Sequence, residues 1–346
     1  MNHRKGLLLL LPVFSASVLG ACGSSKVTTT TTTTSKPATT TTTAAPTYVL
    51  TGLPVVAGGP SPTRPALMVK IDNAQPAWPQ AGLDHADIIY EEMVEGGLTR
   101  YMAVFQSQDA PTVGPIRSIR ATDADLAAQT TGLVGYSGGI PAFISDLRAT
   151  GAIDVGVNLA PSAYHRDYSR PAPHNLYSST TALYAAANGR GPTPHALFDF
   201  GPPTTTEPLA SSKAVSAFTI VISGATIDTW THDAAGNQWT KAINGIAMHN
   251  ASGTPLGATN VIIEYVPYVA TGFIDPAGNP VPEAQLVGSG SAEIAFGGRV
   301  ATGQWSKTSP SAAPVYTYSN GQPVKLLPGR TWVIFAPVGA SFTSQP

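Results

Sequence analysis

Apolar runs alternate with short helical patterns through the first part of the chain. A strand begins at Ala66–Ile71, and strand-like runs follow in "HADIIYEEMVEGG", "LTRYMAVFQS" and "GLVGYSGG". The segments "ATDADLAAQTTG", "IPAFISDLRATG" and "SSTTALYAAANG" combine helix-start residues with a terminal glycine. Strands that alternate with short helices predict an α/β layered domain, which we place at residues 63–205.

The pattern changes after "GPPTTTEPLASS". Short β-rich runs such as "AFTIVIS", "NVIIEYVPYV" and "TWVIFAP" follow, and "AAGN", "FGGR" and "SNGQ" between such runs are typical of hairpin turns. We therefore predict a mainly antiparallel β domain at residues 206–346. The predicted fold class is α+β, with an N-terminal α/β layered domain followed by this β domain.

The first 22 residues have the pattern of a bacterial lipoprotein signal. Basic residues at the start precede an apolar run from Gly6 to Gly20, and "LGAC" ends at Cys22, the one cysteine of the chain. We expect Cys22 to carry the lipid (palmitate) that holds the protein on the extracytoplasmic face of the cell membrane. The alternative is an uncleaved anchor helix, for which the run is short because a bilayer span needs about 20 residues.

Residues 23–62 are rich in Thr, Pro and Gly, a composition that buries too little apolar surface to offset the entropy of ordering. We predict a disordered tether with candidate O-glycosylation sites.

With Cys22 lipidated, no disulfide can form, so the fold depends on its apolar core. Loss of Arg4 and Lys5 with the signal leaves 17 of the 19 basic residues against 20 acidic ones, which argues against a nucleic-acid partner.

Arginine is concentrated in the first predicted domain. Eight of the eleven arginines lie there, with Lys70 as the only lysine. Arginine favours bidentate recognition of carboxylate or phosphate, although codon bias is an alternative cause. Arg117 and Arg120 come just before Thr122 and Asp125, which resemble a capping box at a helix N-terminus, a position that favours anions.

The rival interpretation is that Asp123 and Asp125 pair with these arginines and leave no room for a ligand.

Two further groups could carry chemistry. In "YHRDYSRPAPHNLY", His174 is a candidate acid or base and Asn175 a candidate hydrogen-bond donor, or the segment is an ordered loop that satisfies its own backbone.

The second group is acidic: Asp72 lies at the end of the first strand, and Glu91, Glu92 and Glu95 lie in "YEEMVEGGLTR". Carboxylates at strand ends suit acid/base work, but their spacing matches no metal motif, so we predict neither a metal nor a cofactor. The G-x-S-x-G, P-loop and H-E-x-x-H motifs are absent from the sequence.

Three long stretches carry a family resemblance. "RPALMVKIDNAQPAWPQAGLDHADIIYEEMVEGGLTRYMAVFQS", "VGPIRSIR" and "RPAPHNLYSS", together with "NVIIEYVPY" and "VKLLPGRTWVIFAP" further on, resemble the YerB-like bacterial lipoproteins, the domain-of-unknown-function family 3048. The resemblance covers about Arg64 to Pro337. It implies a two-domain extracytoplasmic lipoprotein and no established reaction. It maps onto mostly polar positions: Asp72, Asn73, Gln80, Glu91, Glu95, Gly96, Gly97, Thr99, Arg100, Arg117, Ser118, Arg120, His174 and Asn175.

Three functions are compatible with these observations. The first is a binding or accessory module of the envelope that recognises an anionic ligand, such as a phosphate-containing glycan, through Arg100, Arg117, Arg120, Asn175 and Asp72. The second is an envelope hydrolase or phosphotransferase acting on a phosphorylated or lipid-linked glycan, with His174 or Glu95 as catalytic residue. The third is a structural partner of other envelope proteins. Whether the protein is an enzyme is left open.

Overall fold

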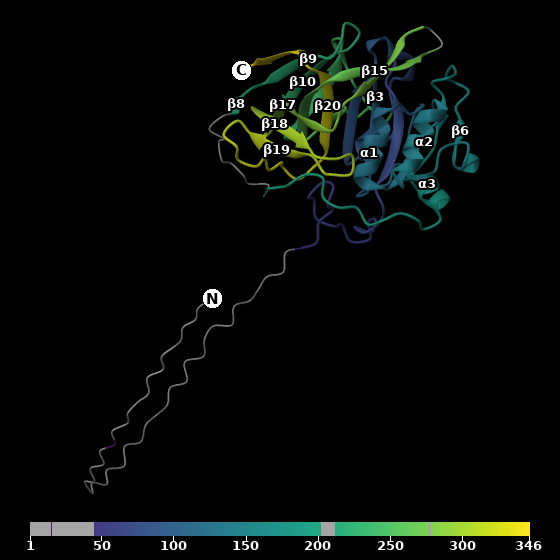
Figure 1. Ribbon diagram of the computed structural model, residues 1–346, viewed down its shortest axis with the longest axis horizontal. Helices are drawn as coiled ribbons and strands as arrows, with labels where there is room; N and C mark the ends of the chain where they lie inside the picture. Colours follow the sequence, from purple (N-terminus) through teal and green to yellow (C-terminus); the bar gives the residue numbers. More distant parts are fainter. Residues whose placement is uncertain (1–14, 16–44, 202–211, 276–277) are drawn as a thin grey trace, which may run out of the picture. The chain divides into compact units, whose positions relative to one another are not determined.

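The computed structural model describes Ser15 and residues 45–201, 212–275 and 278–346. Residues Ala45–Pro346 form one compact unit, which carries all the labelled helices and strands in Figure 1. The predicted lipidation site Cys22 and nearly all of the predicted signal lie outside the described residues. Among the described helices, none is both long and apolar enough to span a bilayer.

A mixed sheet of eleven described strands forms the centre of this unit. In spatial order its strands are β19 (Val315–Tyr318), β18 (Arg299–Lys307), β17 (Gly288–Phe296), β14 (Asn260–Val266), β20 (Thr331–Pro337), β2 (Ile88–Met93), β3 (Thr99–Phe105), β1 (Leu67–Asp72), β4 (Leu133–Gly135) and β5 (Ile153–Asp154), and β8 (Ser212–Ala214) pairs with β18. β20 is parallel to both of its neighbours, as β4 is to β1 and β5; the other pairings are antiparallel.

The remaining strands form one six-stranded antiparallel sheet and two small hairpins. The six-stranded sheet contains β12 (Ile246–Ala247), β11 (Gln238–Ile243), β10 (Ile227–Asp233), β9 (Ala217–Val221) and β21 (Ser341–Gln345), with β13 (Gly257–Ala258) paired to β11. The hairpins are β15 (Tyr268–Ile274) with β16 (Pro280–Ala284), and β6 (His165–Arg166) with β7 (Leu176–Tyr177).

The helices are short and lie near one end of the large sheet (Figure 1). They are α1 (Thr122–Thr130), α2 (Pro141–Ala149) and α3 (Thr180–Ala187), with single 3₁₀ turns η1 (Gln75–Ala77), η2 (Leu83–His85), η3 (Glu95–Gly97) and η4 (Pro161–Ala163).

The large sheet has an apolar layer on each face because successive side chains of a strand point to opposite sides. Along β20, Trp332 and Ile334 join the core beneath the six-stranded sheet and α3, whereas Val333 and Phe335 join the core beneath α1 and α2. A strand buried on both faces needs apolar residues at every position, which explains the uninterrupted run "TWVIFAP".

The protein is mostly sheet, and the predicted layering into an α/β domain followed by a separate β domain is not confirmed. β14, β17, β18, β19 and β20 come from the second predicted domain, yet they continue the sheet begun by β1 to β5. The physical reason is that β2 is buried on both faces and needs a second neighbour, which β20 supplies by pairing in parallel with it.

The fold also begins before residue 63, where we expected the tether to end. Tyr48 and Leu50 are 1% and 0% exposed, and Leu50 packs in the same core as Phe198. The Thr-rich run stops at Thr43, and the apolar side chains after it are enough to anchor residues 45–62 to the fold. The predicted boundary was therefore placed too late because it rested on average composition.

Candidate functional site

Strands β1, β2 and β4 end at one edge of the large sheet, here called the carboxyl edge. They end at Asp72, Met93 and Gly135, and β1 is parallel to β2 because both pair antiparallel with β3. Open α/β sheets commonly bind their ligands outside the carboxyl ends of the strands. A ligand site formed by the polar residues predicted from the sequence is therefore expected at this edge.

The segment that holds Arg117 and Arg120 lies at this edge. Asp72 N donates to Pro115 O at 2.9 Å, and Arg117 N donates to Lys70 O at 2.9 Å, so the segment extends the sheet beside the end of β1. On its other side, Ser137 N donates to Arg117 O at 3.0 Å. This pairing places Arg117 between the end of β1 and the loop after β4, and Arg120 follows just before α1.

Asp72 contacts two of the predicted residues, His174 and Arg117. Its Oδ2 lies 2.6 Å from His174 Nδ1 and 3.1 Å from Arg117 Nε. The Asp72 carboxylate is almost completely buried, whereas the His174 and Arg117 side chains are 16% and 21% exposed. The buried Asp72 carboxylate therefore holds two side chains, His174 and Arg117, that are partly exposed to solvent.

Arg120 forms a two-point ion pair with Glu95. Its Nε donates to Glu95 Oε1, and its Nη2 donates to Oε2 at 2.9 Å. Burial acts to raise the pKa of Glu95, but the hydrogen bonds and charge of Arg120 outweigh it and hold that pKa below the ordinary value of a glutamate. Glu95 is therefore a paired carboxylate and, in this arrangement, a poor proton donor near neutral pH.

Arg100 differs from the other two arginines because no carboxylate of the described residues lies within 4 Å of it. It is only 7% exposed, and its Nη1 donates to Ser118 O at 2.9 Å. Burial, followed by the charges of Arg120 and Arg117, lowers its pKa to about 10. The three guanidinium groups are thus close enough to repel one another, and we call Arg100, Arg117 and Arg120 the arginine cluster.

The rival pairing of the arginine side chains with Asp123 and Asp125 is not observed. Asp123 Oδ1 accepts from Lys70 Nζ at 2.8 Å, and its Oδ2 accepts from the backbone N of Arg120 at 2.7 Å. The predicted capping box is also wrong, because the Thr122 hydroxyl accepts from Ala284 N, and no side chain caps α1 from Ala121. Asp72 and Glu95 are the carboxylates that face the cluster instead.

Asn175 makes its contacts within its own loop rather than at the cluster. It is buried, its Oδ1 accepts from Arg166 Nη1 at 2.7 Å, and its Nδ2 donates to Arg170 O at 3.4 Å. The structure therefore brings together Asp72, Glu95, His174 and the three arginines, and leaves Asn175 beside them as support for the loop.

Two serines lie at the edge: Ser118, which is among the positions to which the family resemblance maps, and Ser137, which was not predicted as a site residue. Ser118 Oγ and Ser137 Oγ lie 3.4 Å apart, and both residues are partly exposed. Ser137 occurs in "YSGG", which the sequence presents only as a glycine-rich turn. The position of Ser137 shortly after the short buried strand β4 was the one signal that could have identified this residue.

The Glu91 and Glu92 side chains are buried and form ion pairs inside the protein. As neighbours on β2 they point to opposite faces, and each meets a fully buried lysine. Glu92 bonds Lys70 beneath α1, whereas Glu91 Oε2 accepts from Lys241 Nζ at 2.7 Å beneath the six-stranded sheet. In the described part of the chain, no group of three or more His, Cys, Asp or Glu side chains is arranged to hold a metal.

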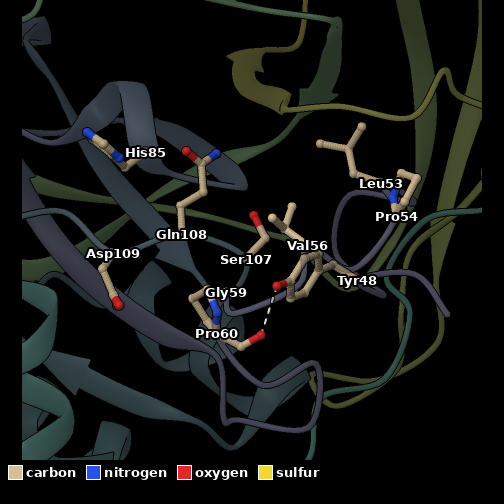
Figure 2. A pocket seen from close by; sticks show the side chains of 10 residues that line it. All are labelled: Tyr48, Leu53, Pro54, Val56, Gly59, Pro60, His85, Ser107, Gln108 and Asp109. Carbon is tan, nitrogen blue, oxygen red and sulfur yellow. Dashed lines mark hydrogen bonds between the residues drawn. The ribbon is translucent and has the colours of Figure 1, made fainter.

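A cavity of about 440 Å³ lies at the opposite edge of the sheet (Figure 2). Leu53, Pro54 and Val56 from the N-terminal segment form an apolar wall, and the Tyr48 hydroxyl donates to Pro60 O at 2.8 Å. The Ser107 hydroxyl in this cavity is already bonded to Asp87. Three of its polar side chains, Tyr48, Ser107 and Asp109, are thus already bonded within the protein, Asp109 to Arg64 at 2.7 Å.

Comparison with known proteins gives the same family for both halves of the chain. Residues 50–193 match the N-terminal domain of a protein of unknown function, DUF3048, and residues 218–333 match the C-terminal domain of the same family. The chain is 28% identical over 283 residues to "Putative lipoprotein YerB" of Bacillus subtilis (strain 168), covering 79% of this chain and 81% of that protein.

The crystal structure of YerB protein from Bacillus subtilis has a similar fold. The TM-score is 0.72 at 23% identity, and the match covers 85% of this chain and 98% of that chain. The match of the fold extends across both family domains, as expected if they share one sheet.

Proposed function

The chain belongs to the DUF3048 family of proteins of unknown function, and we propose that it is a lipid-anchored binding module of the cell envelope that recognises an anionic ligand. The lipid would be attached at Cys22 and hold the fold at the extracytoplasmic face of the membrane. The lipoprotein signal in the sequence and the lipoprotein name of the relative support this anchor.

The observation that carries the proposal is the charge balance of the arginine cluster. Asp72 and Glu95 each pair with one arginine of the cluster, whereas Arg100 has no carboxylate of the described residues within 4 Å. An unpaired charge is costly to bury, so the arrangement is stabilised when a further anion joins it. Guanidinium groups bind carboxylate and phosphate through paired hydrogen bonds, which makes a phosphate-containing ligand the best match.

Pyrophosphate is a suitable first probe of this proposal. We expect it to bind the wild-type protein at low ionic strength, and we expect the Arg117→Gln/Arg120→Gln double variant to bind at least about tenfold more weakly, because each lost charged hydrogen bond contributes roughly 1.5–3 kcal/mol. Isothermal titration calorimetry measures both dissociation constants.

The matched control is Arg148→Gln, which removes an arginine on α2 that is 51% exposed and pairs with Asp154. Its affinity should equal that of the wild type. Wild-type affinity in the double variant, or an equal loss in the control, would show that the cluster is not the binding site.

One contact favours the enzyme as a second candidate. His174 Nδ1 lies 2.6 Å from Asp72 Oδ2, and the described residues offer no hydrogen-bond partner to its Nε2. A carboxylate that orients a histidine in this way leaves the second ring nitrogen available as a base. If this candidate is right, His174→Gln should abolish hydrolysis of a phosphodiester or glycosyl-phosphate substrate and leave pyrophosphate affinity within about twofold. Equal turnover by wild type and variant would exclude it.

A further inference from the structure

A second cavity opens at the carboxyl edge, on the face of the large sheet that carries the six-stranded sheet. Its volume is about 320 Å³, in the lower range of small-molecule sites. One wall comes from the loop after β1, through Asn73, Gln75 and Trp78, and the opposite wall comes from the β11–β12 turn, through Asn244 and Ile246. Asn73 directly follows Asp72, so this cavity adjoins the arginine cluster across the sheet.

Trp78 is held rigidly in this wall. Its Nε1 donates to Asn73 Oδ1 at 3.0 Å, and that oxygen also accepts from Gln80 Nε2 at 2.9 Å. Asn73 is fixed in turn, because its Nδ2 donates to Thr99 Oγ1 at 2.8 Å. The ring is partly exposed, although its one polar atom is already satisfied. A fixed aromatic surface of this kind gives contact area without a loss of side-chain entropy on binding.

The chemistry of the lining selects a class of ligand. No charged side chain of the described residues lines the cavity, so an ionic ligand would lose its hydration without compensation. Leu98 and Ile246 are 42% and 48% exposed and add apolar surface, whereas the Gln75 amide makes no hydrogen bond within the described residues. The matching ligand is neutral, with an apolar face beside groups that form hydrogen bonds.

We propose that this cavity binds a neutral sugar ring, with the C–H face of a pyranose against the Trp78 indole and its hydroxyl or amide groups toward Gln75. The proposal goes beyond recognition of an anion, because the cavity uses none of the three arginines and would bind a sugar whether or not they bind a phosphate. If both sites are occupied by one molecule, the ligand is a glycan that carries an anionic group.

Intrinsic fluorescence tests the proposal directly. All five tryptophans are described, and Trp230, Trp239, Trp305 and Trp332 are at most 1% exposed, so acrylamide quenching reports on Trp78. We expect N,N′-diacetylchitobiose or cellobiose to change the emission saturably and to protect the quenched fraction. If neither disaccharide does so at any concentration up to its solubility, the proposal is wrong.

Variants at exposed positions keep the test independent of folding. Gln75→Ala and Leu98→Ala should each weaken disaccharide binding at least about threefold, and Trp78→Phe, followed by saturation-transfer NMR, should weaken it further. The Arg117→Gln/Arg120→Gln variant should bind the disaccharide as the wild type does. Disaccharide binding that survives the Gln75 and Leu98 changes would place the sugar elsewhere and overturn the proposal, whatever the result with pyrophosphate.

Discussion

Replacing Arg100 with methionine is expected to stabilise the free protein and to weaken its binding of pyrophosphate at least about tenfold. Arg100 is 7% exposed, and burial together with two neighbouring arginines lowers its pKa to about 10. That shift corresponds to roughly 3 kcal/mol of unfavourable interaction in the charged form. Methionine keeps an unbranched apolar stem without the guanidinium charge, so loss of the bond to Ser118 O, worth about 1 kcal/mol, leaves a net gain of about 1–2 kcal/mol.

Urea unfolding without ligand and calorimetry with pyrophosphate measure the two effects. Arg148→Met, at an exposed ion pair, should change stability by no more than about 1 kcal/mol and leave affinity unchanged. If the charge of Arg100 serves ligand binding at the expense of stability, Arg100→Met should raise the free energy of unfolding and lower the affinity for pyrophosphate. Destabilisation by more than about 2 kcal/mol would instead identify Arg100 as a structural residue.

Replacing Lys241 with alanine is expected to destabilise the protein by about 3–5 kcal/mol near pH 8. Lys241 is fully buried between Glu91 and Asp228 and lies 4.9 Å from the centre of the Trp230 ring. Burial, and then the charge of Glu91, raises the pKa of Asp228 well above the ordinary value of an aspartate. Without the lysine, Glu91 would lie uncompensated beside it in the core.

The cost should be smaller at pH 5 than at pH 8. In the variant the Asp228 carboxyl binds its proton more tightly when folded than when unfolded, because its pKa is raised by burial, so stability falls as pH rises above the unfolded pKa of about 3.9 for aspartate. Urea unfolding at the two pH values tests this, with Lys325→Ala at an exposed position as the control. A loss of stability that does not depend on pH would mean that Lys241 acts through packing alone.

The strands and helices of the first half were largely predictable from sequence, because their periodicity and glycine stops are local signals. The expected strand at Ala66–Ile71 is observed at Leu67–Asp72, and the three expected helices are α1, α2 and α3. The shared sheet was not predictable in this way. The parallel pairing of β2 with β20 joins residues more than 200 positions apart, and nothing in either segment alone identifies its partner.

The sequence indicated where the arginines lie along the chain, but it did not indicate which carboxylates they pair with. Arg117 and Arg120 lie just before a helix start, as the sequence indicated, but their side chains face Asp72 and Glu95 rather than Asp123. Asp123 follows Arg120 closely in sequence, yet it turns inward to Lys70, which the sequence shows only as one charge in an apolar strand. Which carboxylate pairs with which cation depends on the face of the sheet that each helix covers.

The central claim is that the arginine cluster binds an anion, and a crystal structure of the wild-type protein grown with pyrophosphate tests it most directly. The account predicts pyrophosphate oxygens within about 3.2 Å of guanidinium nitrogens from at least two of Arg100, Arg117 and Arg120, with Arg100 among them. Well-ordered arginines that remain on Asp72, Glu95 and Ser118 O, with no anion beside them at saturating pyrophosphate, would contradict it.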